Sequence, residues 1–311
     1  MALAPPLPAG VDVWTPVARA ATDIVVADPS GWAKPVRYHL DGNFEPEAFS
    51  TDGRELFMIQ YLPSTAPVAY RVMSLELSSR EMYPVFSRFK APPERMPGVR
   101  LEQVLSPDGS KLYTLYTNQP SAYANGYGGD AASSAPVTFV HILSLEQHWA
   151  FCLELPKEFW NEPAAAQGMA ASPDGTRLFV VDSSKDLVTE IGTRKLKVLR
   201  TQSLDLGAGG SATAAAISAD GSTLYVGSSG DGSLVRSFST STLEPEATWT
   251  VDGSVLDVRP STDGSELFAA ILPAGAASPM LETYDVKSGA SMHEFAVDGL
   301  RSIEYVGPLA G

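Results

Sequence analysis

Residues 172–182 read Ser-Pro-Asp-Gly-Thr-Arg-Leu-Phe-Val-Val-Asp, a tight turn followed by a strand. Proline presets φ at the first central position of such a turn, and the aspartate side chain bonds the local backbone. Glycine accepts the positive φ that other residues resist. Three of the four apolar residues after the turn, Phe179, Val180 and Val181, are aromatic or β-branched, as strands favour. The stretch therefore predicts an antiparallel hairpin closed by Asp-Gly.

The same phrase occurs five times, each time two residues before a Leu-Phe or Leu-Tyr pair. The aspartates of the five copies are Asp52, Asp108, Asp174, Asp220 and Asp263, and each is followed by glycine. Asp174 and Asp220 are 46 residues apart and Asp220 and Asp263 are 43 apart, whereas the two earlier intervals are 56 and 66. Repetition at this period is typical of a propeller or a repeat array, and the longer intervals indicate insertions.

Strand-like runs around each turn predict four-stranded antiparallel blades. The clearest set is 100–106, 111–117, 138–146 and 148–156, and similar sets surround the last two turns, with their second strands at 223–229 and 266–272. Segments 11–20, 22–28 and 34–40 lack a fourth strand, and 300–306 reads as a single strand. Pairing this last strand with the first three would close a ring and cover open edges.

We therefore predict an all-β fold, a β-propeller of four-stranded antiparallel blades closed by the C-terminal strand and the N-terminal strands. Six blades are expected, with five or seven as alternatives, and an open β-solenoid fits less well. Residues 1–10 are interpreted as a tail and 11–311 as a single propeller domain.

Composition indicates a well-packed globular protein and argues against several partners. The chain has 311 residues, of which 44% are hydrophobic and 19% charged, and its net charge is -14. This charge disfavours nucleic acid and anionic membrane surfaces, which need clustered Lys and Arg. No apolar run is long enough to span a membrane. A part of a longer exported or anchored protein would have the same composition, so the compartment stays open.

The turn followed by Leu-Tyr-Val resembles the YVTN-type propeller repeats, relatives of the WD-repeat class. The copies at 172–182 and 218–229 carry the resemblance best, and it extends over about 47–297. The quinoprotein amine dehydrogenase heavy chain belongs to the same broad superfamily. Segment 139–156 is similar to uncharacterised, actinobacterial-type propellers. Ser229 replaces the usual Asn, and no Trp-Asp pair closes a blade. These motifs concern turns and cores, so the resemblance implies a fold and no activity.

No catalytic or metal-binding pattern stands out, and no cofactor is predicted. No two of the four histidines have metal-ligand spacing, and Cys152 is the only cysteine. His141 is expected to be a hydrogen-bonded strand residue, and Cys152 a buried structural thiol. The glycine-rich stretch 207–212 precedes a predicted strand, so it is interpreted as a loop and not as a dinucleotide fingerprint. No Gly-x-Ser-x-Gly elbow occurs.

Long connections are the best indication of function, because binding residues concentrate in loops. In each blade the connections from second to third strand and from one blade to the next leave the same end. The longest of these surround the second repeat, at 90–98, 118–136 and 157–167. We expect a binding site there, made by the polar and aromatic residues Arg95, Tyr123, Asn125, Tyr127, Glu158 and Trp160.

The favoured hypothesis is a non-catalytic binding or scaffold propeller that presents this loop-rich face to a protein, a glycan or a small ligand. The alternative is an enzyme or enzyme subunit of the lactonase or quinoprotein dehydrogenase heavy-chain type, with a site at the mouth of the central channel. A cluster of ionisable side chains at that mouth would favour the alternative, and the sequence identified no such cluster.

Overall fold

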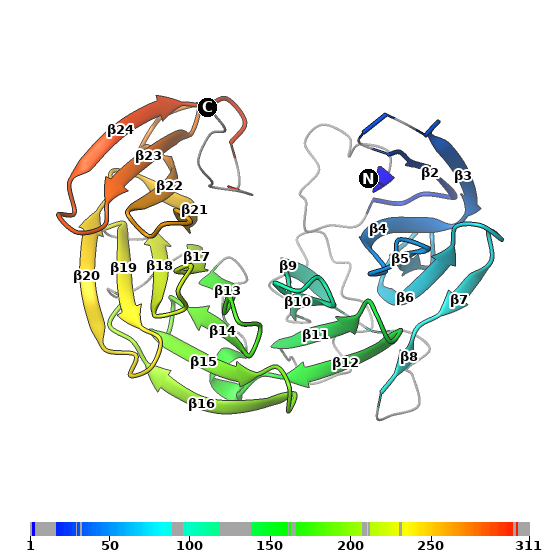
Figure 1. Ribbon diagram of the computed structural model, residues 1–311, viewed down its shortest axis with the longest axis horizontal. Coiled ribbons are helices and arrows are strands. Elements are labelled where there is room, and N and C mark those ends of the chain that lie inside the picture. Colours follow the sequence, from blue (N-terminus) through cyan, green and yellow to red (C-terminus); the bar gives the residue numbers. More distant parts are fainter. Residues whose placement is uncertain are drawn as a thin grey trace. The chain divides into compact units, whose positions relative to one another are not determined.

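The computed structural model describes strands that form six sheets (Figure 1). The chain divides into two compact units, Met1–Glu154 and Leu155–Gly311. The described residues are 2–3, 17–28, 30–31, 33–88, 96, 98–117, 138–160, 162, 166–206, 210, 212–229, 232–300 and 303.

The first unit contains three sheets. One has the order β1-β2-β3, with β1 (Ala2–Leu3), β2 (Ala21–Val26) and β3 (Val36–Asp41). The next has the order β4-β5-β6-β7, with β4 (Asn43–Phe49), β5 (Glu55–Leu62), β6 (Ala69–Glu76) and β7 (Met82–Pro84). The third has the order β8-β12-β11-β10-β9, with β8 (Phe86–Ser87), β9 (Val99–Leu105), β10 (Lys111–Thr117), β11 (Thr138–Ser144) and β12 (Trp149–Glu154).

The second unit contains three four-stranded antiparallel sheets, each with its strands in chain order. They comprise β13 (Gln167–Ala171), β14 (Arg177–Asp182), β15 (Leu187–Gly192) and β16 (Lys197–Ser203); β17 (Ala212–Ile217), β18 (Thr223–Ser229), β19 (Leu234–Ser239) and β20 (Pro245–Thr250); and β21 (Ser254–Pro260), β22 (Glu266–Leu272), β23 (Met280–Asp285) and β24 (Ser291–Ala296). Within this unit the first strands β13, β17 and β21 contact one another in succession, and the last strands lie outside (Figure 1).

The repeated four-stranded antiparallel pattern confirms the predicted all-β class. Strands β10, β18 and β22 have the predicted bounds, because a turn marks the start of each. Two details differ. Residues 17–20 of the expected first strand are not in a strand, and 11–16 lie outside the described residues. The third sheet also gains β8, which pairs in parallel with β12.

All five Asp-Gly turns use the same hydrogen bonds. In the turn at Asp174, the Ser172 hydroxyl donates to the carboxylate at 2.6 Å, the same oxygen accepts the Thr176 N–H at 3.0 Å, and Gly175 has φ +67°. These hydrogen bonds lower the pKa of Asp174 to about 2. The carboxylate therefore accepts hydrogen bonds from within its own turn. The motif marks the connection between the first and second strands of a sheet and so indicates the strand order.

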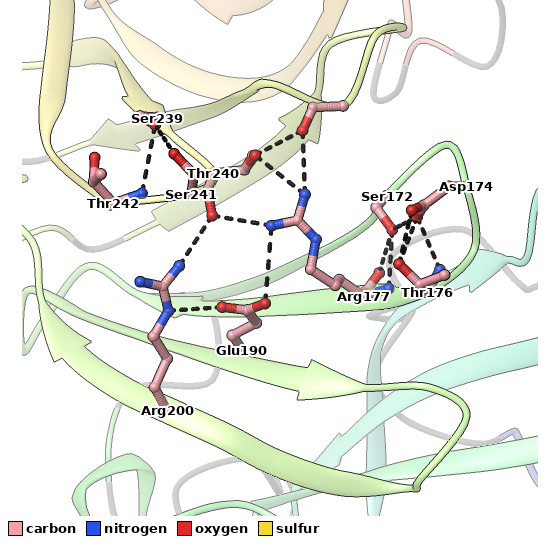
Figure 2. A network of polar contacts seen from close by, with 11 residues as sticks. Ser172, Asp174, Thr176, Arg177, Glu190, Arg200, Ser239, Thr240, Ser241 and Thr242 are labelled. Atoms are coloured by element: carbon pink, nitrogen blue, oxygen red, sulfur yellow. Dashed lines mark hydrogen bonds and ion pairs between the residues drawn. The ribbon is translucent and has the colours of Figure 1, made fainter.

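Side chains near these turns also join neighbouring sheets. In the second unit Glu190 lies between two arginines, with Arg200 Nε 2.6 Å and Arg177 Nη1 3.8 Å from its carboxylate (Figure 2). Both guanidinium groups donate to the carbonyl oxygen of Thr240, in the turn between β19 and β20, at 3.0 and 2.9 Å. The network connects the sheet of β13 to the sheet of β17.

The antiparallel order separates short turns from long connections, as predicted. Turns from first to second strand, such as 172–176, leave one end of each sheet, together with third-to-fourth turns such as 193–196. In the third sheet, the opposite end carries the connection 118–137 between β10 and β11, and the connection 155–166 leaves β12 at that same end. In each sheet we call this opposite end the loop-bearing end.

The expected closing strand 300–306 lies outside the described residues except for Leu300 and Ile303, and neither of these is in a strand. Ile303 is held against β21: its N–H donates to the Asp257 carboxylate at 2.7 Å, and Arg259 Nε donates to its carbonyl at 3.0 Å. In the described part of the chain, no helix is both long and apolar enough to cross a membrane.

Candidate functional site

Only two of the six sequence-predicted contact residues fall within the described structure. Arg95, Tyr123, Asn125 and Tyr127 lie outside the described residues. Glu158 and Trp160 belong to the second unit, on and directly after the 3-10 turn η3 (Lys157–Phe159). The structure therefore gives a setting for these two residues and leaves the other four as predictions.

The segment around Trp160 is anchored and only partly available for contacts. Phe159 is completely buried, and its carbonyl oxygen accepts a hydrogen bond from Gln167 Nε2 at 2.9 Å. The indole N–H of Trp160 donates to the carbonyl of Leu155 at 3.1 Å, and Lys157 Nζ lies 5.9 Å from the indole ring centroid. Glu158 is exposed. A partner could therefore meet the Glu158 carboxylate and part of the indole ring without refolding this segment.

A cluster of ionisable side chains, absent from the sequence predictions, joins two sheets of the first unit. Arg100 on β9 reaches across to β4, where its Nη2 meets the Glu45 carboxylate at 2.5 Å and its Nη1 meets Glu47 at 2.8 Å. The Glu47 side chain is 2% exposed, whereas Arg100 and Glu45 are 28% and 33% exposed. One carboxylate is thus buried behind the guanidinium and the other stays in reach of solvent.

Neutral groups complete this cluster. Gln103 donates from Nε2 to the second oxygen of Glu47 at 2.6 Å, and the Tyr61 hydroxyl donates to Glu45 at 2.7 Å. Each carboxylate therefore has two protein donors. We call Glu45, Glu47, Arg100, Gln103 and Tyr61 the Arg100 cluster.

Burial controls the protonation of the Arg100 cluster. Loss of solvation raises the pKa of Glu47 to about 7, although the nearby Arg100 charge opposes the shift. Burial also raises the pKa of Tyr61 well above its ordinary value. For Arg100, burial alone would lower the pKa, but the carboxylates of Glu47 and Glu45 raise it above the ordinary value. Glu47 therefore changes its charge near neutral pH.

An aromatic stack lies in the same layer between the two sheets. The Tyr116 ring stacks on Tyr70, with centroids 4.7 Å apart, and on Phe139, with centroids 5.5 Å apart. All three are buried. Tyr116 and Phe139 are neighbours in sequence of Thr117 and Thr138, at which the connection 118–137 begins and ends. The connection that holds three predicted contact residues thus starts and ends on a rigid base.

Part of this cluster could have been found in the sequence. Glu45 and Glu47 are two residues apart on β4, a spacing that ordinarily places two side chains on one face of a strand. Their arginine could not be found, because it is 53 residues beyond Glu47 and the pairing passes through two irregular registers. Glu47 lies in a bulge between Pro46 and Ala48, and the β9–β10 register shifts beside Arg100.

The Arg100 cluster holds charge in place and leaves few free donors for chemistry. Both terminal nitrogens of Arg100 and both carboxylates have protein partners. No group of three or more His, Cys, Asp or Glu suited to a metal ion occurs among the residues the structure describes. The arrangement can stiffen the two sheets and present a partly exposed Arg–Glu pair to a ligand.

The raised pKa of Glu47 predicts an unusual pH dependence of stability. Its folded pKa of about 7 lies above the ordinary value of 4.5, so the folded state prefers the protonated carboxyl. The contribution of the Glu47 carboxyl to the free energy of unfolding is therefore complete below about pH 4.5, and it declines as the pH rises to about 7. Glu47→Gln removes this titration. We expect wild type to lose about 3 kcal/mol relative to Glu47→Gln between pH 4.5 and 7.5.

Urea denaturation of both proteins across this pH range measures the difference. Titration of the other groups affects both proteins and cancels in the comparison. Parallel stability curves for the two proteins would show that the pKa of Glu47 is not raised.

Comparisons with known proteins support the fold and leave the family open. No protein-family model matches the chain, and no curated protein matches its sequence. Among solved structures, the β-propeller domain of Cps50 (Swd1) from Myceliophteria thermophila is 15% identical, with 91% of this chain and 82% of that chain covered and a TM-score of 0.50. A "putative 6-phosphogluconolactonase" from Bacteroides fragilis is 14% identical, with 93% and 82% covered and a TM-score of 0.53.

Hydrazine synthase from Kuenenia stuttgartiensis is 21% identical over 64% of this chain and 49% of that chain, with a TM-score of 0.48. The present chain thus spans about half the length of that protein. At these identities a likeness concerns architecture alone. The propeller part of the predicted resemblance is supported, and the YVTN-type and actinobacterial assignments stay predictions.

Proposed function

We propose that this chain is a non-catalytic binding propeller that presents its loop-bearing end to a protein, glycan or small ligand. One observation carries the proposal: in the first unit, the ends of the longest connection adjoin a layer whose buried charges are already paired and whose aromatic rings are stacked. A rigid base with a long variable connection is a common arrangement for recognition. Saturated polar groups offer little for bond making or breaking.

The contact residues of this proposal are those predicted from the sequence, together with the exposed parts of Glu45 and Arg100. In the first unit they are Arg95, Tyr123, Asn125 and Tyr127, and in the second unit Glu158 and Trp160. Tyrosine, tryptophan and arginine are enriched among residues that dominate binding energies. The net charge of -14 makes nucleic acid an unsuitable partner.

A double variant, Tyr123→Ala with Tyr127→Ala, tests this proposal. The matched control is Glu146→Ala, an exposed residue in the short turn between β11 and β12, at the opposite end of the same sheet. Candidate ligands come from a glycan array and a thermal-shift screen, and candidate proteins from affinity purification. A ligand that binds wild type and the control is expected to bind the double variant at least tenfold more weakly. Equal binding by all three proteins would refute this location.

The lactonase or dehydrogenase alternative has one observation in its favour, the carboxyl of Glu47 whose pKa is about 7. Groups with a pKa near the working pH suit general acid–base catalysis. The fold neighbours include the Swd1 β-propeller domain and the "putative 6-phosphogluconolactonase", and at their low identity they favour neither reading. Turnover of sugar lactones by wild type, abolished in a Glu47→Gln variant that is still folded at the assay pH, would replace the binding proposal with this one.

For the architecture we propose six blades closed by the C-terminal segment. The support is Ile303, whose backbone is held by Asp257 and Arg259 beside β21, since β21 itself lies beside β17. In a closed ring, the first strand of the next blade would lie beside β21, where Ile303 is held. Small-angle X-ray scattering tests closure: a compact chain of this length has a radius of gyration of about 19 Å. A clearly larger value would indicate an open arrangement.

A further inference from the structure

His141 is a buried histidine with an unused nitrogen. It lies in the middle of β11 and is 2% exposed. Among the residues that the structure describes, no group forms a hydrogen bond with its Nε2, so the expectation of a hydrogen-bonded strand histidine does not extend to this atom. The Tyr116 ring meets the imidazole edge-on, with centroids 6.2 Å apart. A buried polar atom without a partner destabilises the folded state, so its retention requires an explanation.

Two sulfur atoms lie on the same side of the sheet as His141. Cys152 on β12 is the direct register partner of His141, and directly opposed residues point to the same face. The Cys152 thiol donates to the thioether of Met96, with the sulfur atoms 3.7 Å apart. Both sulfur residues pack against the apolar layer between the second and third sheets. Cys152 is half-buried, not fully buried as expected, so an ion could reach its thiol.

The spacing of the two sulfur atoms suits a shared metal ion. For an ion about 2.3 Å from each sulfur, the 3.7 Å separation corresponds to an S–ion–S angle of about 107°, close to the tetrahedral angle. Thiolate and thioether ligands select soft ions, above all Cu(I), and imidazole also suits copper.

We propose that His141 Nε2, Cys152 Sγ and Met96 Sδ form a binding site for one soft monovalent cation, Cu(I) or its analogue Ag(I). Binding replaces the thiol proton of Cys152, which leaves to solvent, and the metal keeps its oxidation state. Hard ions such as Mg²⁺ and Ca²⁺ are excluded, because they prefer oxygen ligands. The His and Cys spacing patterns of the sequence could not predict this site, because its ligands come from three separate segments and include a methionine.

Competition with the chromophoric chelator bicinchoninate tests the proposal on the full chain. The assay is anaerobic and contains ascorbate, so that copper remains Cu(I). Wild type is expected to remove one equivalent of Cu(I) from the chelator. Cys152→Ser should weaken binding at least a hundredfold, and Met96→Leu and His141→Gln at least tenfold each. The matched controls are His148→Gln and Met82→Leu in the same unit, which should bind as wild type does. Circular dichroism confirms the fold of each variant.

X-ray absorption spectroscopy of the copper-loaded protein provides a readout of the ligands themselves. One nitrogen and two sulfur neighbours are expected, and Cys152→Ser should lose one sulfur. The proposal is wrong if wild type and Cys152→Ser compete equally, or if wild type fails to compete with bicinchoninate. It is also wrong if one copper ion bridges two chains, because the ligand set would then be intermolecular.

Discussion

Arg100→Ala is expected to lower the free energy of unfolding by about 2–3 kcal/mol at pH 8. The substitution leaves Glu47 buried without its cation, and a broken buried pair is costly because the remaining charge is uncompensated. It also removes the partner of Glu45 and the packed stem of the arginine. Protonation of Glu47 limits the loss, since its folded pKa is already about 7.

The loss should therefore depend on pH in a definite direction. At pH 6 most Glu47 side chains are protonated in the wild type, so less ion pairing is present to be lost. We expect the effect of Arg100→Ala to be about 1 kcal/mol smaller at pH 6 than at pH 8. Urea denaturation at the two pH values measures both effects.

Two further variants make this prediction specific. Arg54→Ala is the control, because Arg54 is 79% exposed and its contact with Asp52 is a surface pair at 3.6 Å, so little change is expected. Combining Arg100→Ala with Glu47→Gln should restore part of the stability, since no buried charge then remains. A double variant with the summed loss of both single variants would show that the two side chains act independently.

Gly253→Ala is expected to destabilise the second unit by about 3 kcal/mol. Gly253 has φ +137°, a conformation that is essentially restricted to glycine. A Cβ atom there would lie 2.3 Å from the carbonyl oxygen of Leu272 and 2.6 Å from Cα of Pro273. Both are backbone atoms at the end of β22, so the start of β21 must move away from its partner strand.

Gly275→Ala separates the two causes of this effect. Gly275 also has a positive φ, +76°, but a Cβ atom there would meet nothing within 4 Å. Its substitution should cost only about 1 kcal/mol, from the backbone conformation alone. Thermal and urea unfolding of both variants gives the comparison. Similar losses at the two positions would mean that the contact with Leu272 is relieved without cost.

The turns and strand bounds were predictable from the sequence where local chemistry decides the structure. The five Asp-Gly turns form as expected, because each aspartate and its preceding serine satisfy their own turn, as at Ser172 and Asp174. The turns locate the following strands, so β10, β18 and β22 have the predicted bounds. The short strand β8 was missed, because a two-residue parallel pairing has no local pattern.

Less of the candidate site could be predicted from the sequence. The connection 118–137 was identified by its length, yet its rigid base depends on Tyr70, Tyr116 and Phe139, which are far apart in the chain. Glu45 and Glu47 alone resembled ordinary exposed strand residues. Only the approach of Arg100 from the neighbouring sheet makes them a buried ion-pair cluster.

The sequence by itself determined the all-β class, the strand order and the end of each sheet that carries the long connections. It could do so because turn chemistry and strand alternation act over a few residues. Tertiary structure alone decided that Glu47 is buried opposite Arg100 and that His141 lies beside Cys152. These contacts depend on register, on bulges and on the packing of one sheet against another, which join residues distant in the chain and leave no local trace.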